Sequence, residues 1–283
     1  MFGADLSSHI RTVQQLSNLT QAMRSLAAAR QRQAQENFAG LERYAAATLS
    51  ALQQGMGLLA ATKELQPVER TGMRRLVVCL SEHGFVGALN DVLLTQVEKA
   101  RAESPCQLQV LGKRGLRQCQ ERGLPILDSD SMPTTLGAVA RTASVLVESL
   151  FQAVTSGEVA EIEVIFARLR GSVSYEPFRQ RLFPPQVVPK VLNGDPPHHT
   201  LPAEVLTARL LQEYAFSQVT WMIASSFACE QAARFVAMDA SHRNLEEQLG
   251  DLRQRERAER QDSITSEILE VATASALLGG GSR

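Results

Sequence analysis

The sequence predicts an α/β protein in which two long terminal helices form an antiparallel coiled coil around an inserted α/β segment. Both ends of the chain are long, almost free of proline and glycine, and have apolar residues three or four positions apart. The middle instead alternates short apolar runs with helical patterns, which is typical of an α/β layer. The expected domains are an N-terminal helix over 1–60, the α/β segment with a proline-rich return loop over 61–202, and a C-terminal helix over 203–283.

The N-terminal region favours one continuous helix. Its first 58 residues contain no proline, and alanine, glutamine and arginine, which are good helix formers, are abundant. A helix from about Leu6 to Leu58 would span roughly 80 Å at the usual rise per residue. Its narrow apolar stripe is expected to consist of Ile10, Val13, Leu16, Leu19, Met23 and Leu26.

Short apolar runs in the middle of the chain predict strands. LVVCL at 76–80 reads as a buried strand, followed by a glycine-containing turn and a helix over 88–102. QLQVL repeats the strand pattern with a short helix after it, residues 134–155 read as a helix, and 162–166 and 172–175 as strands. Six prolines between 184 and 202 then indicate a loop that leads into the second long helix.

The C-terminal region has the seam of a coiled coil. Between Ala203 and Leu278 there is no proline and a single glycine, Gly250. Steps of three and four residues separate its apolar positions, with one histidine among them: Phe235, Met238, His242, Leu245, Leu249 and Leu252. Such a seam needs a partner, and the N-terminal helix, packed antiparallel, is the one we expect. Because Glu256 and Glu259 occupy the next seam positions, pairing should end near Leu252.

The last turns, SITSEILEVATASALL, are apolar on most faces. An unpaired helix with apolar residues all round is expected to be surrounded by another protein.

Composition excludes several function classes. Lysine and arginine number 29 against 30 aspartate and glutamate, and only 5% of residues are aromatic, which argues against nucleic-acid binding. None of the four cysteines forms a CxxC pair, so no zinc site or disulfide framework is expected, and a reducing cytosol fits best. No apolar run reaches the ~18 residues of a membrane span. We therefore expect a soluble protein that reaches a membrane only through partners.

Several short patterns resemble ligand sites only weakly. The turn from His83 to Ala88 follows a strand and opens a helix, but its spacing is not that of a dinucleotide fingerprint. Gly112-Lys113 lacks the upstream glycine and following Ser or Thr of a phosphate-binding loop. Ser81 and His83 are an unpromising nucleophile–base pair, and His198-His199 lacks further metal ligands. We expect no catalytic residue, no cofactor and no metal.

Four separated blocks together resemble a known family. They are TQAMRSLAAARQRQAQ, VVCLSEHGFVGALN, EQAARFVAMDASHRN and RQDSITSEILEV. In order and spacing they resemble the gamma subunit of F-type ATP synthases, whose patterns are TKAMxMVAAxK, GLCGxxN, SEQxARMxAMxxAxxN and RQxxITxEIxEI. The resemblance covers nearly the whole chain, and four blocks in register are far more specific than any one of them.

The resemblance implies a non-catalytic rotor subunit. The terminal helices would be the central stalk, the insert a Rossmann-like base domain, and the C-terminal tip would turn in a bearing of alpha and beta subunits (alpha3-beta3). The base would hold the epsilon subunit and the c-ring, so that H+ or Na+ flow drives ATP synthesis or the reverse, at the cytoplasmic face of a bacterial inner membrane. Positions matched to subunit contacts are Met23, Arg234, Met238, Arg260, Gln261, Thr265 and Ile268, and those of the base-domain turn are Gly84, Gly87 and Asn90.

Departures from the family pattern leave alternatives open. The turn has Phe-Val-Gly-Ala where the family usually has Leu-Cys-Gly-Gly, and Gln21 and Arg30 replace lysines. These changes favour the hypothesis of a divergent form from an alternate bacterial F-type ATPase. A coiled-coil scaffold with an α/β head is the first competing function. An α/β enzyme that binds nucleotide at the Gly84–Gly87 turn is the second.

Overall fold

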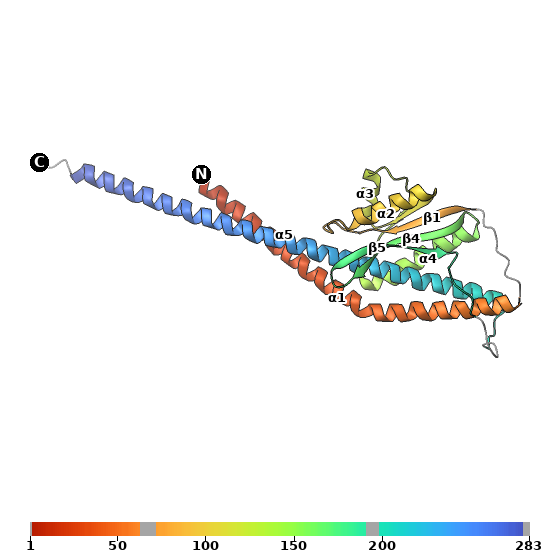
Figure 1. The fold of residues 1–283 in the computed structure, drawn as a ribbon. Helices are drawn as coiled ribbons and strands as arrows, with labels where there is room; N and C mark the ends of the chain where they lie inside the picture. The colour runs from red at the N-terminus through yellow and green to blue at the C-terminus, as the bar shows by residue number, and fades with distance from the viewer. Residues whose placement is uncertain (1, 63–71, 191–197, 280–283) are drawn as a thin grey trace. The chain divides into compact units, whose positions relative to one another are not determined.

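The two long terminal helices are present in the structure, a computed structural model that describes residues 2–62, 72–190 and 198–279. Helix α1 runs from Phe2 to Thr62 and helix α5 from Ala203 to Gly279 (Figure 1). Between them lie β1 (Met73–Cys79), α2 (Leu89–Glu103), β2 (Gln107–Leu111), α3 (Lys113–Glu121), β3 (Asp128–Asp130), the 3-10 turn η1 (Leu136–Ala138), α4 (Val139–Thr155), β4 (Val159–Arg170) and β5 (Ser174–Phe183). The predicted α/β fold class is confirmed.

The chain divides into two compact units, which are described separately. The larger is Leu26–Val236, and the smaller combines Met1–Ser25 with Ala237–Arg283. The predicted division at residues 60 and 202 stays a prediction. Part of the expected proline-rich loop, 191–197, lies outside the described residues.

A five-stranded sheet with the order β3-β2-β1-β4-β5 organises the larger unit. Neighbouring strands from β3 to β4 are parallel, and β5 joins β4 antiparallel as an edge strand. The order 3-2-1-4 is that of a doubly wound Rossmann-like sheet. Strand β1 has the continuous apolar run expected of a central parallel strand, since helices cover both of its faces.

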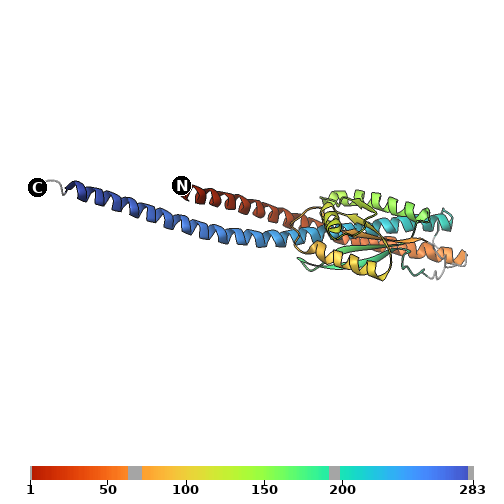
Figure 2. The same cartoon turned by 90° about the horizontal axis from the view of Figure 1, so that it is seen from above.

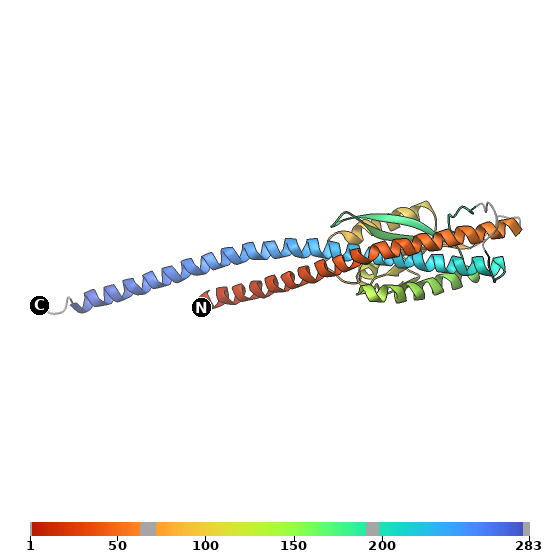
Figure 3. The ribbon, with the colours of Figure 1, turned by 90° about the horizontal axis from the view of Figure 1, so that it is seen from below.

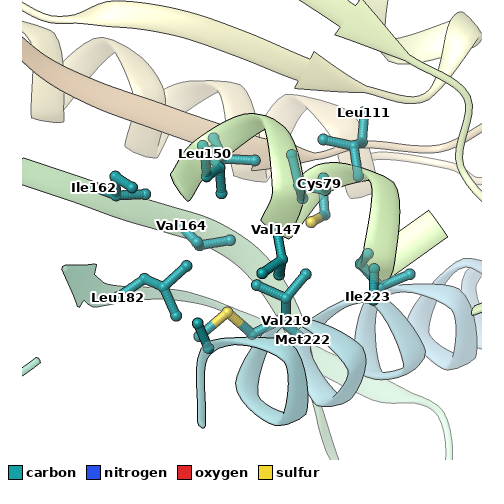
Figure 4. Packing of buried hydrophobic residues seen from close by; sticks show 14 of the residues in the cluster. Cys79, Leu111, Val147, Leu150, Ile162, Val164, Leu182, Val219, Met222 and Ile223 are labelled. Atoms are coloured by element: carbon teal, nitrogen blue, oxygen red, sulfur yellow. The ribbon is translucent and has the colours of Figure 1, made fainter. Parts of the chain in front are cut away.

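Alternate residues of β1 enter two separate cores. Val77 and Cys79 face a core completed by α4, β4, β5 and residues 215–224 of α5, part of which is drawn in Figure 4. Leu76 and Val78, with Leu80 just after the strand, face the opposite core, which α2 and α3 cover. The single tryptophan, Trp221 of α5, packs edge-on against Phe166 of β4 with ring centroids 5.4 Å apart. The sheet is thus held directly on α5.

Helices α1 and α5 also pack together within the larger unit, where Figures 2 and 3 show them side by side. Ala34 packs on Phe227, Thr48 hydrogen-bonds Ser217 at 2.7 Å, and Thr207 donates to the carbonyl of Gly55 at 3.0 Å. Residue numbers rise along one helix as they fall along the other, so the pairing is antiparallel as predicted.

The smaller unit is also an antiparallel helix pair. Gln14 accepts a hydrogen bond from Arg253, Ser17 contacts His242 and Glu246, and Arg24 pairs with Asp239. Among these contacts, the one between Arg253 and Gln14 lies furthest toward the C-terminus of α5. Its position agrees with the predicted end of the seam near Leu252. On α1, however, the predicted stripe is shifted. Val13 is buried, but Leu16 and Leu19 are exposed, and small Ser17 occupies the interface instead.

Two strands differ from expectation. Strand β3 is three exposed acidic or hydroxyl residues without any apolar signal, and it is recognisable by its pairing with β2. Strand β5 was predicted over 172–175 but covers Ser174–Phe183. Its charged residues and Pro177 hide it from pattern reasoning, because an edge strand tolerates both.

Candidate functional site

The turn after β1 lies at the carboxyl edge of the sheet, beside the switch between β1 and β4 where doubly wound folds bind ligands. Phe85 and Gly87 both have positive φ, 62° and 54°. Glycine suits this conformation, whereas a bulky side chain is strained in it. Phe85 is a bulky residue in this conformation. Its side chain is 67% exposed, while that of Val86 beside it is buried.

Backbone N–H groups around this edge are occupied by carboxylates of the chain itself. The Glu82 side chain accepts hydrogen bonds from the N–H of Lys113, which opens α3, at 3.2 Å, and from the N–H of Met132 at 2.9 Å. The Glu230 side chain of α5 accepts from the N–H of Glu82 at 3.2 Å and of His83 at 3.4 Å. A bound phosphate would need such donors. The geometry therefore gives no support to nucleotide binding here.

The predicted base-domain turn residues have structural contacts. Asn90 is 1% exposed; its Oδ1 accepts from the N–H of Ser81, and its Nδ2 donates to Ser81 Oγ at 2.8 Å. Asn90 thereby ties the start of α2 to the end of β1. The carbonyl of Gly84 accepts from Arg234 at 3.4 Å, and Gly87 supplies a left-handed residue in the turn.

Two predicted contact residues on α5 are buried. Arg234 is 7% exposed and pairs with Glu230 at 2.6 Å in the larger unit. Met238 is 3% exposed and belongs to the helix pair of the smaller unit. On α1, Met23 is half-buried.

The other predicted contact residues lie on an exposed stretch of α5. Every residue from 257 to 272 is exposed in the chain taken by itself. Arg260 is 74% exposed and only weakly paired with Glu256, at 3.8 Å, while Gln261 and Thr265 bond only along the helix. Ile264, Ile268 and Val271 expose 51%, 63% and 70% of their surfaces. This stretch is the largest run of exposed apolar side chains that the structure describes on one helix.

Other reactive groups are poorly placed for chemistry. Burial raises the pKa of the Cys79 thiol to about 12 and that of Cys119 to about 11, so both are protonated near neutral pH. His199 bonds the nearby carbonyl of Leu201, and the described residues contain no cluster of three side chains suited to a metal. Within the same residues, no helix is both long and apolar enough to cross a bilayer.

Sequence reasoning missed Glu82, Glu230 and the exposed Phe85. Glu230 stands inside one of the quoted blocks, but its partners are about 150 positions away in the chain, so spacing gave no signal. Phe85 stands inside another block, and its positive φ is visible only in the backbone.

Comparison with known proteins identifies the family. A family model described as ATP synthase matches residues 3–278. The curated ATP synthase gamma chain of Moorella thermoacetica is 30% identical over 284 residues, covering 96% of this chain and 98% of the relative. This chain belongs to the ATP synthase gamma-chain family.

Further relatives agree across the whole gamma chain. The ATP synthase gamma chain of Pasteurella multocida is 26% identical and covers 98% of this chain. Among solved structures, a chain of the Euglena gracilis mitochondrial ATP synthase, solved as OSCP/F1/c-ring, matches with a TM-score of 0.69 over 99% of this chain and 95% of its own length. A chain of the Tetrahymena thermophila mitochondrial ATP synthase central stalk matches with a TM-score of 0.59 over 78% of this chain and 98% of its own length. At 13% and 18% identity these two likenesses show the fold alone.

Membership confirms the prediction of a gamma, or central-stalk, subunit, which is a non-catalytic rotor part of ATP synthase. It also decides against the two competing functions, an unrelated scaffold and a nucleotide-binding enzyme.

Proposed function

We propose that this gamma chain is the rotating shaft that couples transmembrane H+ or Na+ flow to ATP synthesis or hydrolysis in a surrounding alpha3-beta3 hexamer. The observation that carries the proposal is the exposed stretch 257–272 of α5, where Ile264, Ile268 and Val271 face solvent in the isolated chain. Exposing large apolar side chains along a helix is unfavourable in water, so this stretch is expected to be enclosed by partner protein.

Torque requires no catalytic group on the shaft. As it turns, the shaft presents different side chains to three chemically equivalent catalytic subunits. Each subunit is shifted between conformations by the difference in its contact free energy with successive faces of the shaft. Antiparallel pairing of α1 with α5 supplies bending stiffness, and the exposed stretch 257–272, which α5 alone contributes, supplies asymmetry.

Direct contacts with the alpha and beta subunits are proposed for Arg260, Gln261, Thr265 and Ile268, whose side chains are accessible. Met23 is proposed to contact a beta subunit from α1. Buried Arg234 and Met238 are proposed to serve the same interface from within, by fixing the shape of the shaft.

The remaining partners are proposed for the base domain. It would hold the epsilon subunit and the c-ring, with the chain peripheral at the cytoplasmic face of a bacterial inner membrane. Support comes from relatives in bacterial species and from the central stalk/c-ring setting of a matched structure. The segments 1–60, 61–202 and 203–283 would be shaft, base and shaft.

The test is substitution in the assembled complex. Arg260→Ala and Met23→Lys should each lower ATP-driven ion pumping per ATP hydrolysed, while the gamma chain keeps its melting temperature. Arg243→Ala is the matched control, because Arg243 is also 74% exposed on α5 and also forms an i,i+4 pair. Pumping unchanged in both variants, or reduced equally in the control, would contradict the proposed contacts.

The hypothesis of a divergent form from an alternate F-type ATPase has a separate test. Its genome should carry a complete second set of ATP synthase subunit genes, with this gamma gene beside one set. A genome with a single set would remove the hypothesis without affecting the proposed rotor function.

A further inference from the structure

We propose that Glu230 and Arg234 of α5 are positioning residues that clamp the turn after β1 to the shaft helix, so that force on the base domain passes directly into α5. We call this pair, with its contacts to residues 82–84, the α5 clamp. The inference rests on the proposed rotor function and names the residues through which base and shaft helix move together. All of these residues belong to the larger unit.

Each of the two charged side chains of the α5 clamp also hydrogen-bonds the backbone of the turn after β1. The two carboxylate oxygens of Glu230 accept from two consecutive N–H groups, those of Glu82 and His83. Arg234 donates to the carbonyl of Gly84 at 3.4 Å and closes the pair with Glu230 at 2.6 Å. Three successive residues of the turn are therefore held by two side chains one helical turn apart.

Burial makes this connection resistant to separation. The Glu230 and Arg234 side chains are only 4% and 8% exposed. Pulling the turn away from α5 would leave charged groups in a site from which water is excluded, where unpaired charge is costly. Surface ion pairs lack this property, because water replaces a lost partner. The same burial leaves Arg234 little surface with which to touch another subunit.

Glu82 extends the connection across the sheet edge. Its N–H is held by Glu230, while its side chain accepts from the N–H of Lys113 and of Met132. One buried residue thus joins α5 to the start of α3 and to the loop that follows β3. Loops after three parallel strands are connected to the shaft helix by this route.

The strained conformation of Phe85 fits the same role. A bulky residue at φ 62° persists only where its surroundings fix the backbone. The α5 clamp holds the residues just before Phe85. The next residue, Val86, is held in place by the burial of its own side chain.

The experiment compares Glu230→Gln and Arg234→Met with Arg122→Met in the assembled complex. Arg122 is the matched control, because it forms ion pairs between α2 and α3 in the same unit without involving α5. Two quantities are measured: hydrogen exchange of the segment containing Glu82 and His83, and ion pumping per ATP hydrolysed. The wild-type chain is assayed first, because its failure to support pumping would count against the rotor function itself.

With a working wild-type complex, both clamp variants should raise exchange of that segment by about tenfold or more. Their pumping per ATP should fall, with ATP hydrolysis retained, and the control should change neither. If Glu230 and Arg234 served only to stabilise the fold, the variants would lower the yield of complex and leave ion pumping per ATP hydrolysed unchanged. If Arg234→Met fails to assemble, Arg234→Lys keeps the charge and loses the reach to Gly84. Wild-type pumping per ATP in the clamp variants, or unchanged exchange, would overturn the proposal.

Discussion

The hydroxyl of Ser17 in α1 donates a hydrogen bond to the carboxylate of Glu246 in α5, at a position where Ser17 is only 1% exposed. Nδ1 of His242 lies 3.2 Å from the same hydroxyl oxygen. Ser17 thus contacts two polar side chains of α5 from a single buried position. A buried polar contact of this kind favours one register of a coiled coil over its neighbours.

Ser17→Ala should therefore lower the free energy of unfolding by about 1 kcal/mol, because one buried hydroxyl hydrogen bond is lost. Leu16→Ala is the matched control: Leu16 is 46% exposed one position away, and its change should stay within about 0.5 kcal/mol. Urea titration of the full chain measures both. A larger loss for Leu16→Ala would mean that the predicted leucine stripe, rather than Ser17, forms the interface.

Glu82→Ala should destabilise the chain by about 2–4 kcal/mol, since it leaves the buried N–H of Met132 and the part-buried N–H of Lys113 without their acceptor. Lys113→Ala tests whether the ion pair with Glu82 matters instead. Its side chain is 67% exposed and 3.5 Å from the carboxylate, so removing it should cost no more than about 0.5 kcal/mol. Equal losses in the two variants would show that the charge pair, and not the backbone contacts, stabilises this edge.

Alanine at two glycines should have opposite effects. A Cβ at Gly115 would lie 2.1 Å from the Cβ of buried Leu80, so Gly115→Ala should cost at least about 2 kcal/mol. Gly40 is exposed inside α1 with nothing within 4 Å, so Gly40→Ala should stabilise by about 0.5–1 kcal/mol through helix propensity. Thermal melts distinguish the two signs, and stabilisation by Gly115→Ala would contradict the close approach of α3 to β1.

Stability should fall at alkaline pH because of buried thiols. Burial raises the pKa of Cys79 from 9.0 to about 12, although a hydrogen bond with Ser226 acts the other way. Between these values the unfolded chain has released the thiol proton and the folded chain has kept it, so folding weakens as pH rises. The slope for this thiol should be about 1.4 kcal/mol per pH unit. Unfolding free energies of wild type and Cys79→Ala from pH 8 to 11 measure it, and parallel curves would contradict the assignment.

The candidate site was only partly predictable. The apolar stretch 264–271 could be recognised from sequence, because the seam is interrupted by Glu256 and Glu259 before it begins. The roles of Glu230 and Arg234 could not, because their partners are backbone groups, which every residue carries. Arg234 was expected to touch another subunit, and its burial against the turn after β1 became visible only in three dimensions.

The sequence by itself determined the long terminal helices and the α/β insert, because helix propensity, the lack of proline and the period of apolar residues act locally. Antiparallel pairing of the two helices could be predicted because the C-terminal seam needs a partner and the N-terminal helix is the other long helix of the chain. It also carried the family blocks. Only the tertiary structure decided which face of α1 is the interface: small Ser17 lets the two helices approach, while bulkier Leu16 and Leu19 remain outside. Likewise it decided that the carboxyl edge of the sheet is filled by Glu82 and Glu230. Both outcomes depend on the shape and hydrogen-bonding needs of distant segments, which local pattern cannot express.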